Sequence, residues 1–123
     1  MLNLDTHVFL HALAGDVLAG EQHLLAENSW SISAIVLWEI AKLAQLRRIQ
    51  VDLDDAELKR LMARIHVWPL DAEVCRESTR LDFASDPADE LIAATSIVHR
   101  VRLLTRDKRI RRSKLVPFAR AAR

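Results

Sequence analysis

The sequence predicts an α/β fold, an α/β/α sandwich in which helices cover a mostly parallel central sheet. Short apolar runs alternate with segments of helical periodicity along all 123 residues, half of which are hydrophobic. No internal repeat, low-complexity segment or Gly/Ser-rich linker separates two parts of the chain. The length suits one hydrophobic core, so we expect a single domain spanning residues 1–123.

The apolar runs are short enough to be buried strands, and the periodic segments are long enough to be helices. Strands are expected at residues 2–5, 30–33, 66–70 and 101–105, with a further candidate at 115–118. Helices are expected near residues 6–13, 20–28, 34–46, 54–65, 71–82 and 87–99. Right-handed crossovers place helices on both faces of a parallel sheet, and ligands bind outside the carboxyl ends of its strands. Functional side chains are therefore expected at that edge, called here the carboxyl edge.

Composition excludes several classes of protein. No apolar run approaches the ~18 residues needed to cross a bilayer, and the N-terminus has no basic leader, which predicts a cytoplasmic protein without membrane contact. The single cysteine, Cys75, excludes an internal disulfide and a thiolate metal cage, and its helical context favours a small buried side chain. Neither a Gly-rich phosphate loop nor a Gly-x-Ser-x-Gly motif is present.

Charge is distributed unequally along the chain, although the net charge is only +1. Residues 1–99 contain 8 Lys or Arg and 16 Asp or Glu, a net −8, whereas residues 100–123 contain 10 and 1, a net +9. A basic block of this kind forms a surface for phosphates or an acidic partner about as often as a solvated tail.

Two acidic residues follow the first two strands. The first strand ends at Asp5 and the chain turns directly into a helix, which places this carboxylate at the carboxyl edge. Glu39 interrupts the apolar first half of the helix after the second strand, one to two turns from the same edge. Both also have structural explanations, because Asp5 is a suitable N-cap and Glu39 continues a polar stripe with Lys42 and Gln45.

The segment SDPADELIAATSIVHR begins a helix with a strong start signal. Asp86 is the expected N-cap, and Asp89 lies at the third helical position. Asp89 shares a helix face with Ala93 and Ser96, whose small side chains allow close packing on the sheet. A capping role and a ligand role are compatible in this turn.

The last strand ends at Thr105, and Asp107 follows it, where a turn or N-cap aspartate is common. Four carboxylates at one edge repel each other unless a cation lies between them. Their oxygen-only donor set favours a hard ion, Mg²⁺ or Mn²⁺. His7 and His11 stand four residues apart on one helix, but they have neither a third ligand nor an intervening Glu, so zinc is disfavoured.

The motifs LDTHVFLHAL, SAIVLWEIAKL, DPADELIAATSI and LLTRDKRI resemble, in order and spacing, those of PIN-domain ribonucleases. The forms LDTHV and LWEIAKL resemble the VapC-type toxins of toxin-antitoxin pairs, and the match spans residues 2 to about 110. By matching position, the resemblance implies catalytic metal ligands at Asp5, Glu39, Asp89 and Asp107. It also places Asp86 and Thr105 at the margin of the pocket.

The resemblance implies a Mg²⁺- or Mn²⁺-dependent endoribonuclease that forms a homodimer and is neutralised by a small VapB-like antitoxin covering its active-site groove. The metal would activate water and stabilise the anionic transition state of RNA phosphodiester hydrolysis. A bare acidic pocket repels RNA, so we expect basic residues to contribute to RNA binding. The candidates are Arg106, Lys108, Arg109, Arg111 and Arg112.

Three positions depart from the resemblance, and none of them removes a metal ligand. Glu90 occupies the place after the third acid where many relatives have Arg. Arg47 stands where the helix that carries Glu39 commonly ends with Gly, which disfavours the usual left-handed cap. The residues before Asp86 lack a His that is often found there.

Other functions fit the motifs less well. A haloacid-dehalogenase-type phosphatase requires a second Asp two residues after the first, where this chain has His7. A receiver domain requires paired acids near the first strand and a Lys closing the last strand, and this chain has neither. A catalytically silent PIN-fold module that binds nucleic acid or protein stays open, because intact ligands do not prove turnover.

Overall fold

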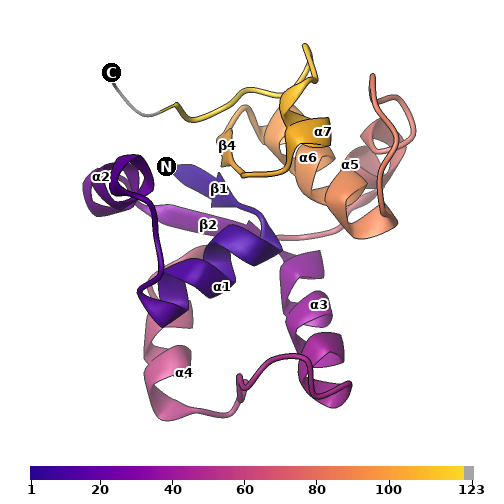
Figure 1. Ribbon diagram of the computed structural model, residues 1–123. Helices are drawn as coiled ribbons and strands as arrows, with labels where there is room; N and C mark the ends of the chain where they lie inside the picture. Colours follow the sequence, from indigo (N-terminus) through magenta and orange to yellow (C-terminus); the bar gives the residue numbers. More distant parts are fainter. Residues whose placement is uncertain (121–123) are drawn as a thin grey trace.

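A four-stranded parallel sheet forms the centre of the computed structural model, which describes residues 1–120 (Figure 1). The strands are β1 (Leu2–Leu4), β2 (Trp30–Ser33), β3 (His66–Trp68) and β4 (Arg102–Leu104). Their order across the sheet is β3-β2-β1-β4, and each neighbouring pair is parallel. The expected α/β/α class with a parallel central sheet is confirmed.

Seven helices connect and follow the strands within the described residues. They are α1 (Thr6–Ala14), α2 (Ala19–Glu27), α3 (Ala34–Gln45), α4 (Ala56–Met62), α5 (Ala72–Glu77), α6 (Pro87–His99) and α7 (Lys108–Arg111). The first two crossovers step from β1 to β3 in one direction, and the third returns across the sheet to β4. Right-handed crossovers in opposite directions place their helices on opposite faces. Figure 1 accordingly shows α1 and α4 below the strands, with α5 and α6 at the upper right.

The central strand β1 is buried along its whole length, as expected for a strand covered by helices on both faces. Leu2 and Leu4 are completely buried within the main hydrophobic core. Between them, the Asn3 side chain donates hydrogen bonds to the Ile92 carbonyl (3.3 Å) and to Ser96 Oγ (2.9 Å) on α6. These bonds fix α6 against the strand that ends at Asp5.

Several element boundaries differ from the expected ones. The helix predicted at 54–65 is shortened to α4, and the one predicted at 71–82 is shortened to α5. The candidate strand at 115–118 contributes only an isolated parallel bridge, between Phe118 and Leu103. Helix α7 was not predicted, because four residues are too few to show helical periodicity. Cys75 is exposed rather than buried, so that expectation was wrong.

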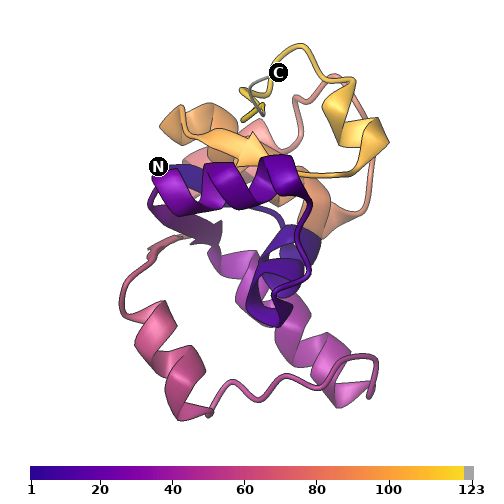
Figure 2. The same cartoon turned by 60° about the vertical axis from the view of Figure 1, so that its left-hand side comes forward.

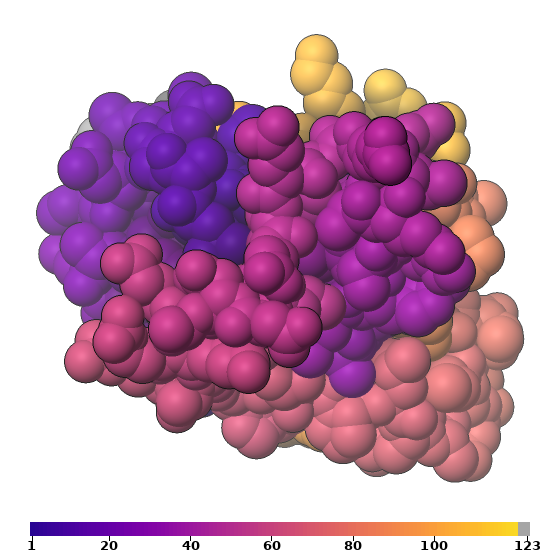
Figure 3. Space-filling model, turned by 90° about the horizontal axis from the view of Figure 1, so that it is seen from below, coloured from indigo at the N-terminus to yellow at the C-terminus, as the bar shows by residue number. Residues whose placement is uncertain are grey.

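The long segment between α3 and α4 extends away from the sheet in both cartoon views (Figures 1 and 2). Seen from below, the segments that precede α6 cover most of the surface, whereas residues beyond 107 are visible only at its far rim (Figure 3). Three acidic residues, Asp52, Asp55 and Glu57, line a pocket of about 480 Å³ between the end of α1 and this segment. None of the helices within residues 1–120 is both long and apolar enough to span a bilayer.

Helix α3 ends in a left-handed cap although no glycine is present. Arg47 has φ 57°, its N–H donates to the Ala44 carbonyl (3.0 Å), and the Arg48 N–H donates to the Leu43 carbonyl (2.9 Å). This pair of bonds is the Schellman arrangement, which normally has Gly at the position of Arg47. The cap disfavoured by the sequence is therefore formed, with a side chain in a strained backbone conformation.

We expect Arg47→Gly to stabilise the protein by about 0.5–1 kcal/mol. The left-handed conformation costs a non-glycine residue about 1–2 kcal/mol, and the greater flexibility of glycine in the unfolded chain offsets part of the gain. Urea denaturation measures the change, with Arg48→Gly as the matched control because Arg48 lacks a positive φ. Equal effects of both substitutions would show that the Arg47 backbone is not strained.

Candidate functional site

The sheet changes direction at β1, because the chain proceeds from β1 to β2 on one side and returns to β4 on the other. Such a switch point leaves a crevice outside the carboxyl ends of the two strands, where α/β proteins bind ligands. Leu4 pairs with Leu104 in the register of β1 and β4, so the residues that follow them, Asp5 and Thr105, reach the crevice together.

Asp5 is the N-cap of α1 and is also turned toward β4. One carboxylate oxygen accepts a hydrogen bond from the Val8 N–H (2.8 Å), and the other accepts one from the Thr105 hydroxyl. The side chain is buried, with 5% relative exposure. Burial raises the pKa of Asp5 above its ordinary value, which the two hydrogen bonds partly offset. The capping bond therefore occupies one carboxylate oxygen of Asp5, and the bond to Thr105 occupies the other.

Glu39 lies on the second turn of α3, next to the start of α1. The Thr6 hydroxyl donates a hydrogen bond to Glu39 Oε1. Burial raises the pKa of Glu39, the Thr6 bond opposes this change, and repulsion from Asp89 and Asp5 raises the pKa further. Glu39 thus experiences the charges of two other candidate ligands.

Asp89 is in the first turn of α6. Further along the same helix, Ala93 and Ser96 are completely buried, as their small size predicted. Ser85 Oγ donates to Asp89 Oδ2 (2.9 Å). Burial raises the pKa of Asp89, and after the opposing Ser85 bond the next contributions are repulsion from Asp107 and Asp86. Asp89 does not follow a strand directly, since α5 lies between β3 and α6.

Asp107 is exposed and is the N-cap of α7. Its Oδ1 accepts from the N–H groups of Arg109 (2.8 Å) and Ile110 (3.0 Å), and its own N–H donates to Thr105 Oγ1 (3.0 Å). Thr105 thereby links Asp107 to Asp5. Asp86 occupies the N-cap position of α6 as expected, but its side chain makes no capping hydrogen bond.

Glu90, the departure next to Asp89, faces the turn that precedes α6. Glu90 Oε2 accepts a hydrogen bond from the Ser85 N–H (3.4 Å), while the Ser85 hydroxyl bonds to Asp89. Ser85 therefore connects the two acids through different donor groups. In this arrangement Glu90 stabilises the turn that precedes α6.

A divalent cation fits the chemistry of this edge. Asp5, Glu39 and Asp89 supply only oxygen donors, and burial together with mutual repulsion raises their pKa values, so a cation would relieve the repulsion. Within residues 1–120, however, no three carboxylate, imidazole or thiol groups are arranged closely enough to hold a metal ion. The carboxylates instead accept hydrogen bonds from hydroxyl and N–H donors, so metal binding requires these side chains to reorient.

Three residues near this site were not recognised as site residues from the sequence. Thr6 and Ser85 each donate a hydroxyl hydrogen bond to a candidate ligand, and the signal for both was a hydroxyl residue close to a motif acid. His7 is exposed, and its positive charge would lower the pKa values of Asp5, Glu39 and Asp89. His11 instead faces Asp16, with Nδ1 to Oδ2 at 3.4 Å, so the structure does not support the zinc pair.

The five candidate RNA-binding residues lie around α7 but differ in their contacts. Arg106 makes two hydrogen bonds to Glu21 on α2, from Nε (2.8 Å) and from a terminal guanidinium nitrogen (2.6 Å). Arg111 donates to the Thr105 carbonyl (3.2 Å), and Arg109 makes a long contact of 3.5 Å with the Ala84 carbonyl. Lys108 and Arg112 are exposed. Arg106 therefore links the end of β4 to α2.

A known protein family matches almost the whole chain. The model of the PIN domain matches residues 3–114, which include every candidate ligand. The chain belongs to the PIN domain family. Ribonuclease VapC22 of Mycobacterium tuberculosis is 33% identical over 97 residues, which cover 76% of this chain and 75% of that protein. The expected resemblance to PIN-domain ribonucleases of the VapC type is confirmed.

Solved structures share the PIN fold of this chain. A toxin-antitoxin complex from Klebsiella pneumoniae matches with a TM-score of 0.69 and 18% identity over 89% of both chains. VapBC2 from Rickettsia felis, bound to a promoter DNA fragment, matches with a TM-score of 0.67 and 19% identity over 97% of this chain and 98% of the other. At these identities the likeness extends to the fold.

Proposed function

We propose that the protein is an endoribonuclease toxin of the VapC type that hydrolyses RNA phosphodiesters with a divalent metal, Mg²⁺ or Mn²⁺. The proposal depends most on one observation: Asp5, Glu39 and Asp89 lie near the β1–β4 switch point, where burial raises the pKa of each and the charge of Asp89 further raises the pKa values of Asp5 and Glu39. The PIN family match and the similarity to a VapC ribonuclease support it. Divalent-metal dependence is general among ribonucleases of this type.

Asp5, Glu39, Asp89 and Asp107 are the residues that would hold the metal. A bound divalent ion supplies Lewis-acid activation of water and neutralises charge on the phosphate. Thr105 holds the second oxygen of Asp5 toward the crevice, whereas the first oxygen stays on the Val8 N–H. Exposed Asp86 lies at the margin and adds negative charge beside Asp89.

RNA must approach this acidic edge from a basic surface. Lys108, Arg109 and Arg112 are exposed around α7 and are the best placed of the candidates to meet phosphates. Arg106 and Arg111 make contacts to Glu21 and to the Thr105 carbonyl, so their first role is to shape the edge. We expect them to contribute mainly to the local positive field.

The proposed partners follow from the relatives. Two structural neighbours are described as a toxin-antitoxin complex and as VapBC2, and we propose that a small VapB-like antitoxin neutralises this chain. We further propose that the protein is a homodimer and acts in the cytoplasm. An antitoxin bound over the carboxyl edge would exclude RNA from it.

Cleavage of purified RNA tests the enzymatic proposal. The protein is expected to cleave total RNA in Mg²⁺ or Mn²⁺ and to lose this activity in EDTA, because the carboxylates alone provide no nucleophile. Restoring excess metal after EDTA is the control for irreversible damage. Cleavage that persists in chelator would contradict the metal mechanism, and RNA binding without cleavage would favour the silent module.

Expression in a bacterial host tests the toxin proposal. Induction of this chain alone is expected to arrest growth within a few generations, and co-expression of a cognate VapB-like antitoxin should restore growth. The Asp5→Asn variant, expressed to the same level, is the control for a non-specific burden. Unaffected growth with abundant folded wild-type protein would contradict the toxin role.

A further inference from the structure

A second concave site adjoins the carboxyl edge beyond β4. This pocket, called here the α2–α7 pocket, has a volume of about 640 Å³ and lies between α2, the end of β4, α7 and the C-terminal segment. The residues that decide its chemistry are Leu18, Leu24, Thr105, Lys108, Arg111 and Arg120. None of the motif acids lines it.

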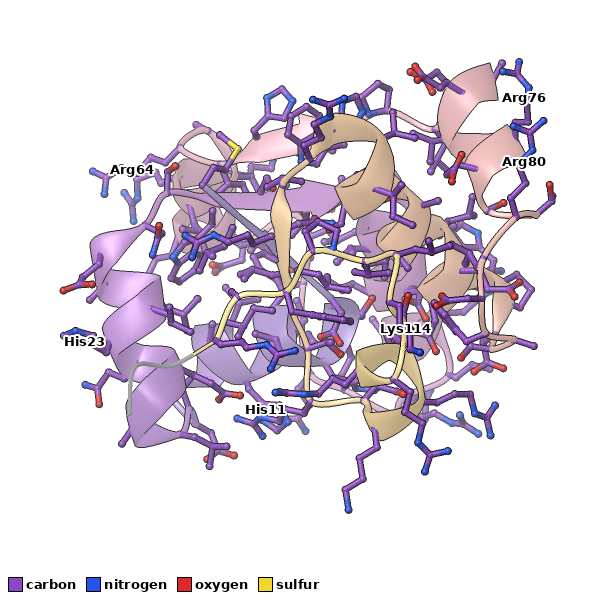
Figure 4. The ribbon with its side chains drawn as sticks, turned by 90° about the horizontal axis from the view of Figure 1, so that it is seen from above. His11, His23, Arg64, Arg76, Arg80 and Lys114 are labelled. Atoms are coloured by element: carbon purple, nitrogen blue, oxygen red, sulfur yellow. The ribbon has the colours of Figure 1, made fainter. Side chains whose placement is uncertain are left out.

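The C-terminal segment closes one side of the pocket. The Leu103 N–H donates to the Pro117 carbonyl (2.8 Å), and the Ala119 N–H donates to the Leu103 carbonyl (2.9 Å). The segment therefore runs parallel to β4 and brings Arg120 to the same edge as Thr105. Figure 4 shows this segment running from Lys114, across the molecule, toward α2.

The pocket combines a basic wall with an apolar wall. Among the residues up to Arg120 that line it, the one carboxylate belongs to Glu21, which is neutralised by Arg106, and the hydrogen bonds from Arg106 also lower the pKa of Glu21. Lys108, Arg111 and Arg120 therefore leave it strongly positive. On the α2 side it is lined by Leu24 and by Leu18, which is 60% exposed. Adjacent basic and apolar walls suit a ligand that carries both a phosphate and a planar base.

Thr105 connects this pocket to the carboxylates. Its side chain donates to Asp5, while the same residue lines the α2–α7 pocket. A phosphodiester at Asp5 would therefore lie close to the pocket. A neighbouring nucleotide is the part of the substrate that reaches it.

We propose that the α2–α7 pocket is a nucleotide subsite, which holds the phosphate of a nucleotide flanking the cleaved bond against Lys108 and Arg120 and its base against Leu18 and Leu24. The inference rests on the proposed function, because it assigns to the same substrate a position next to the reacting phosphate. The subsite would give the enzyme a preference for the base at one flanking position. An acidic protein segment is the competing occupant.

Basic residues on α7 and in the segments after it allow two matched double variants. Lys108 lines the pocket together with Arg120, whereas Arg109 and Arg112 are exposed residues of the same region outside it. Lys108→Ala/Arg120→Ala and Arg109→Ala/Arg112→Ala each remove two positive charges. The second pair measures the loss of attraction and of phosphate contacts outside the pocket, so only a difference between the pairs reports the pocket. Thermal melts establish that both variants are folded.

The experiment measures binding of a labelled 2′-O-methyl RNA hexamer over a salt series in EDTA. The methyl group blocks attack by the 2′-hydroxyl, and EDTA removes the metal that the proposed hydrolysis requires. We expect the pocket pair to weaken binding at least tenfold more than the matched pair. Its log–log salt slope should become shallower by about 0.7, since Lys108 and Arg120 hold one phosphate and each phosphate contact on a single strand contributes about 0.7. Equal losses in the two pairs would overturn the subsite.

Competition and kinetics complete the test. Nucleoside 5′-monophosphates should displace the hexamer from the wild type better than inorganic phosphate does, and Leu18→Ala should remove this advantage. Equal displacement by both competitors would overturn the base-binding wall. In cleavage assays the pocket pair should raise KM more than it lowers kcat. A wild type that cleaves RNA while the pocket pair keeps its KM overturns the subsite alone.

Two further outcomes separate the proposals. In the first outcome, hexamer binding depends on the pocket but the protein does not cleave RNA in any divalent metal. This result overturns the proposed function and leaves the nucleotide subsite supported. In the second outcome, the Lys108→Ala/Arg120→Ala variant binds the hexamer as tightly as the wild type does but no longer binds an acidic antitoxin peptide. This result overturns the subsite in favour of a protein partner.

Discussion

Asp5→Asn is expected to abolish RNA cleavage while the protein remains folded. The substitution preserves an oxygen that can accept the Val8 N–H, so the cap of α1 survives, because Asn caps helices about as well as Asp. It removes the anionic charge and one carboxylate oxygen from the switch point. Loss of an outer partner of a metal ligand costs about 10–100-fold, and loss of a ligand should exceed that.

Asp55 provides the matched control for capping. It is the N-cap of α4, and its carboxylate accepts from the Leu58 N–H (3.0 Å), three residues on, as Asp5 accepts from Val8. Asp55→Asn makes the same chemical change away from the carboxyl edge and should leave cleavage within about twofold of wild type. Cleavage rates and melting curves of both variants decide the matter. Wild-type cleavage by folded Asp5→Asn protein would refute its ligand role.

Thr105→Val separates the position of Asp5 from its charge. Valine has nearly the same shape as threonine but cannot donate to Asp5. The Asp5 carboxylate remains available in this variant, so the expected loss of metal affinity is smaller than for Asp5→Asn, about 10–100-fold. Raising the metal concentration should rescue this variant, whereas Asp5→Asn should not be rescued.

The parts of the fold that were predicted correctly are those whose signal is local. Strands β1 and β2 are short apolar runs followed immediately by helix start signals, and their predicted bounds differ from the observed ones by at most one residue. Asp5 and Asp107 could be placed at the carboxyl edge because Asp5 directly follows β1, Asp107 lies three residues after the end of β4, and each caps the next helix. Such positions depend on a few neighbouring residues alone.

The features that were missed depend on contacts distant in sequence. The pair between Arg106 and Glu21 joins residues 85 positions apart, and a basic cluster in the sequence gives no indication that one member is already bound. The Cys75 environment follows from the docking of the six-residue helix α5, whose buried residue is Val74 instead. Neither fact has a signature in local periodicity.

The hydroxyl groups that donate to the carboxylates lie between these two cases, because one of them could have been predicted from local sequence and the other could not. Thr6 follows Asp5 in the sequence, yet it bonds to Glu39, which lies 33 residues away. Ser85 lies four residues before Asp89 and bonds to it, which a local argument could have found. The sequence thus predicts which acids gather at the edge, but the hydrogen bonds that hold each one depend on how α1 and α3 pack.

In the absence of metal, the wild-type protein is expected to be less stable at pH 7.5 than at pH 5. Burial raises the pKa values of Asp5, Glu39 and Asp89, so the folded protein binds protons more tightly than the unfolded chain. Stability from these groups therefore falls as pH rises from their unfolded pKa values near 4 through the folded ones. Glu21 and Asp82 have lowered pKa values, and their contribution is lost only as pH falls below about 4.

A divalent ion should reverse this loss, since it compensates the same charges that burial and repulsion disfavour. At pH 7.5, free Mn²⁺ at 100 times its dissociation constant stabilises a protein that binds it only when folded by about 2.7 kcal/mol. For a chain of this size that corresponds to a rise in Tm of roughly 10 °C. The rise requires the carboxylates to come closer together than they lie in the described residues, so it measures whether the edge can close around an ion.

The double variant Asp5→Asn/Asp89→Asn supplies the comparison. Any contribution of the histidines is common to both proteins, so the difference between their Tm profiles in EDTA isolates the carboxylates. The variant should melt at a higher temperature than the wild type at pH 7.5 in EDTA and should gain little from Mn²⁺. A wild type whose Tm rises with pH in EDTA, or one that Mn²⁺ does not stabilise, would mean that the hydroxyl and N–H donors alone satisfy these acids.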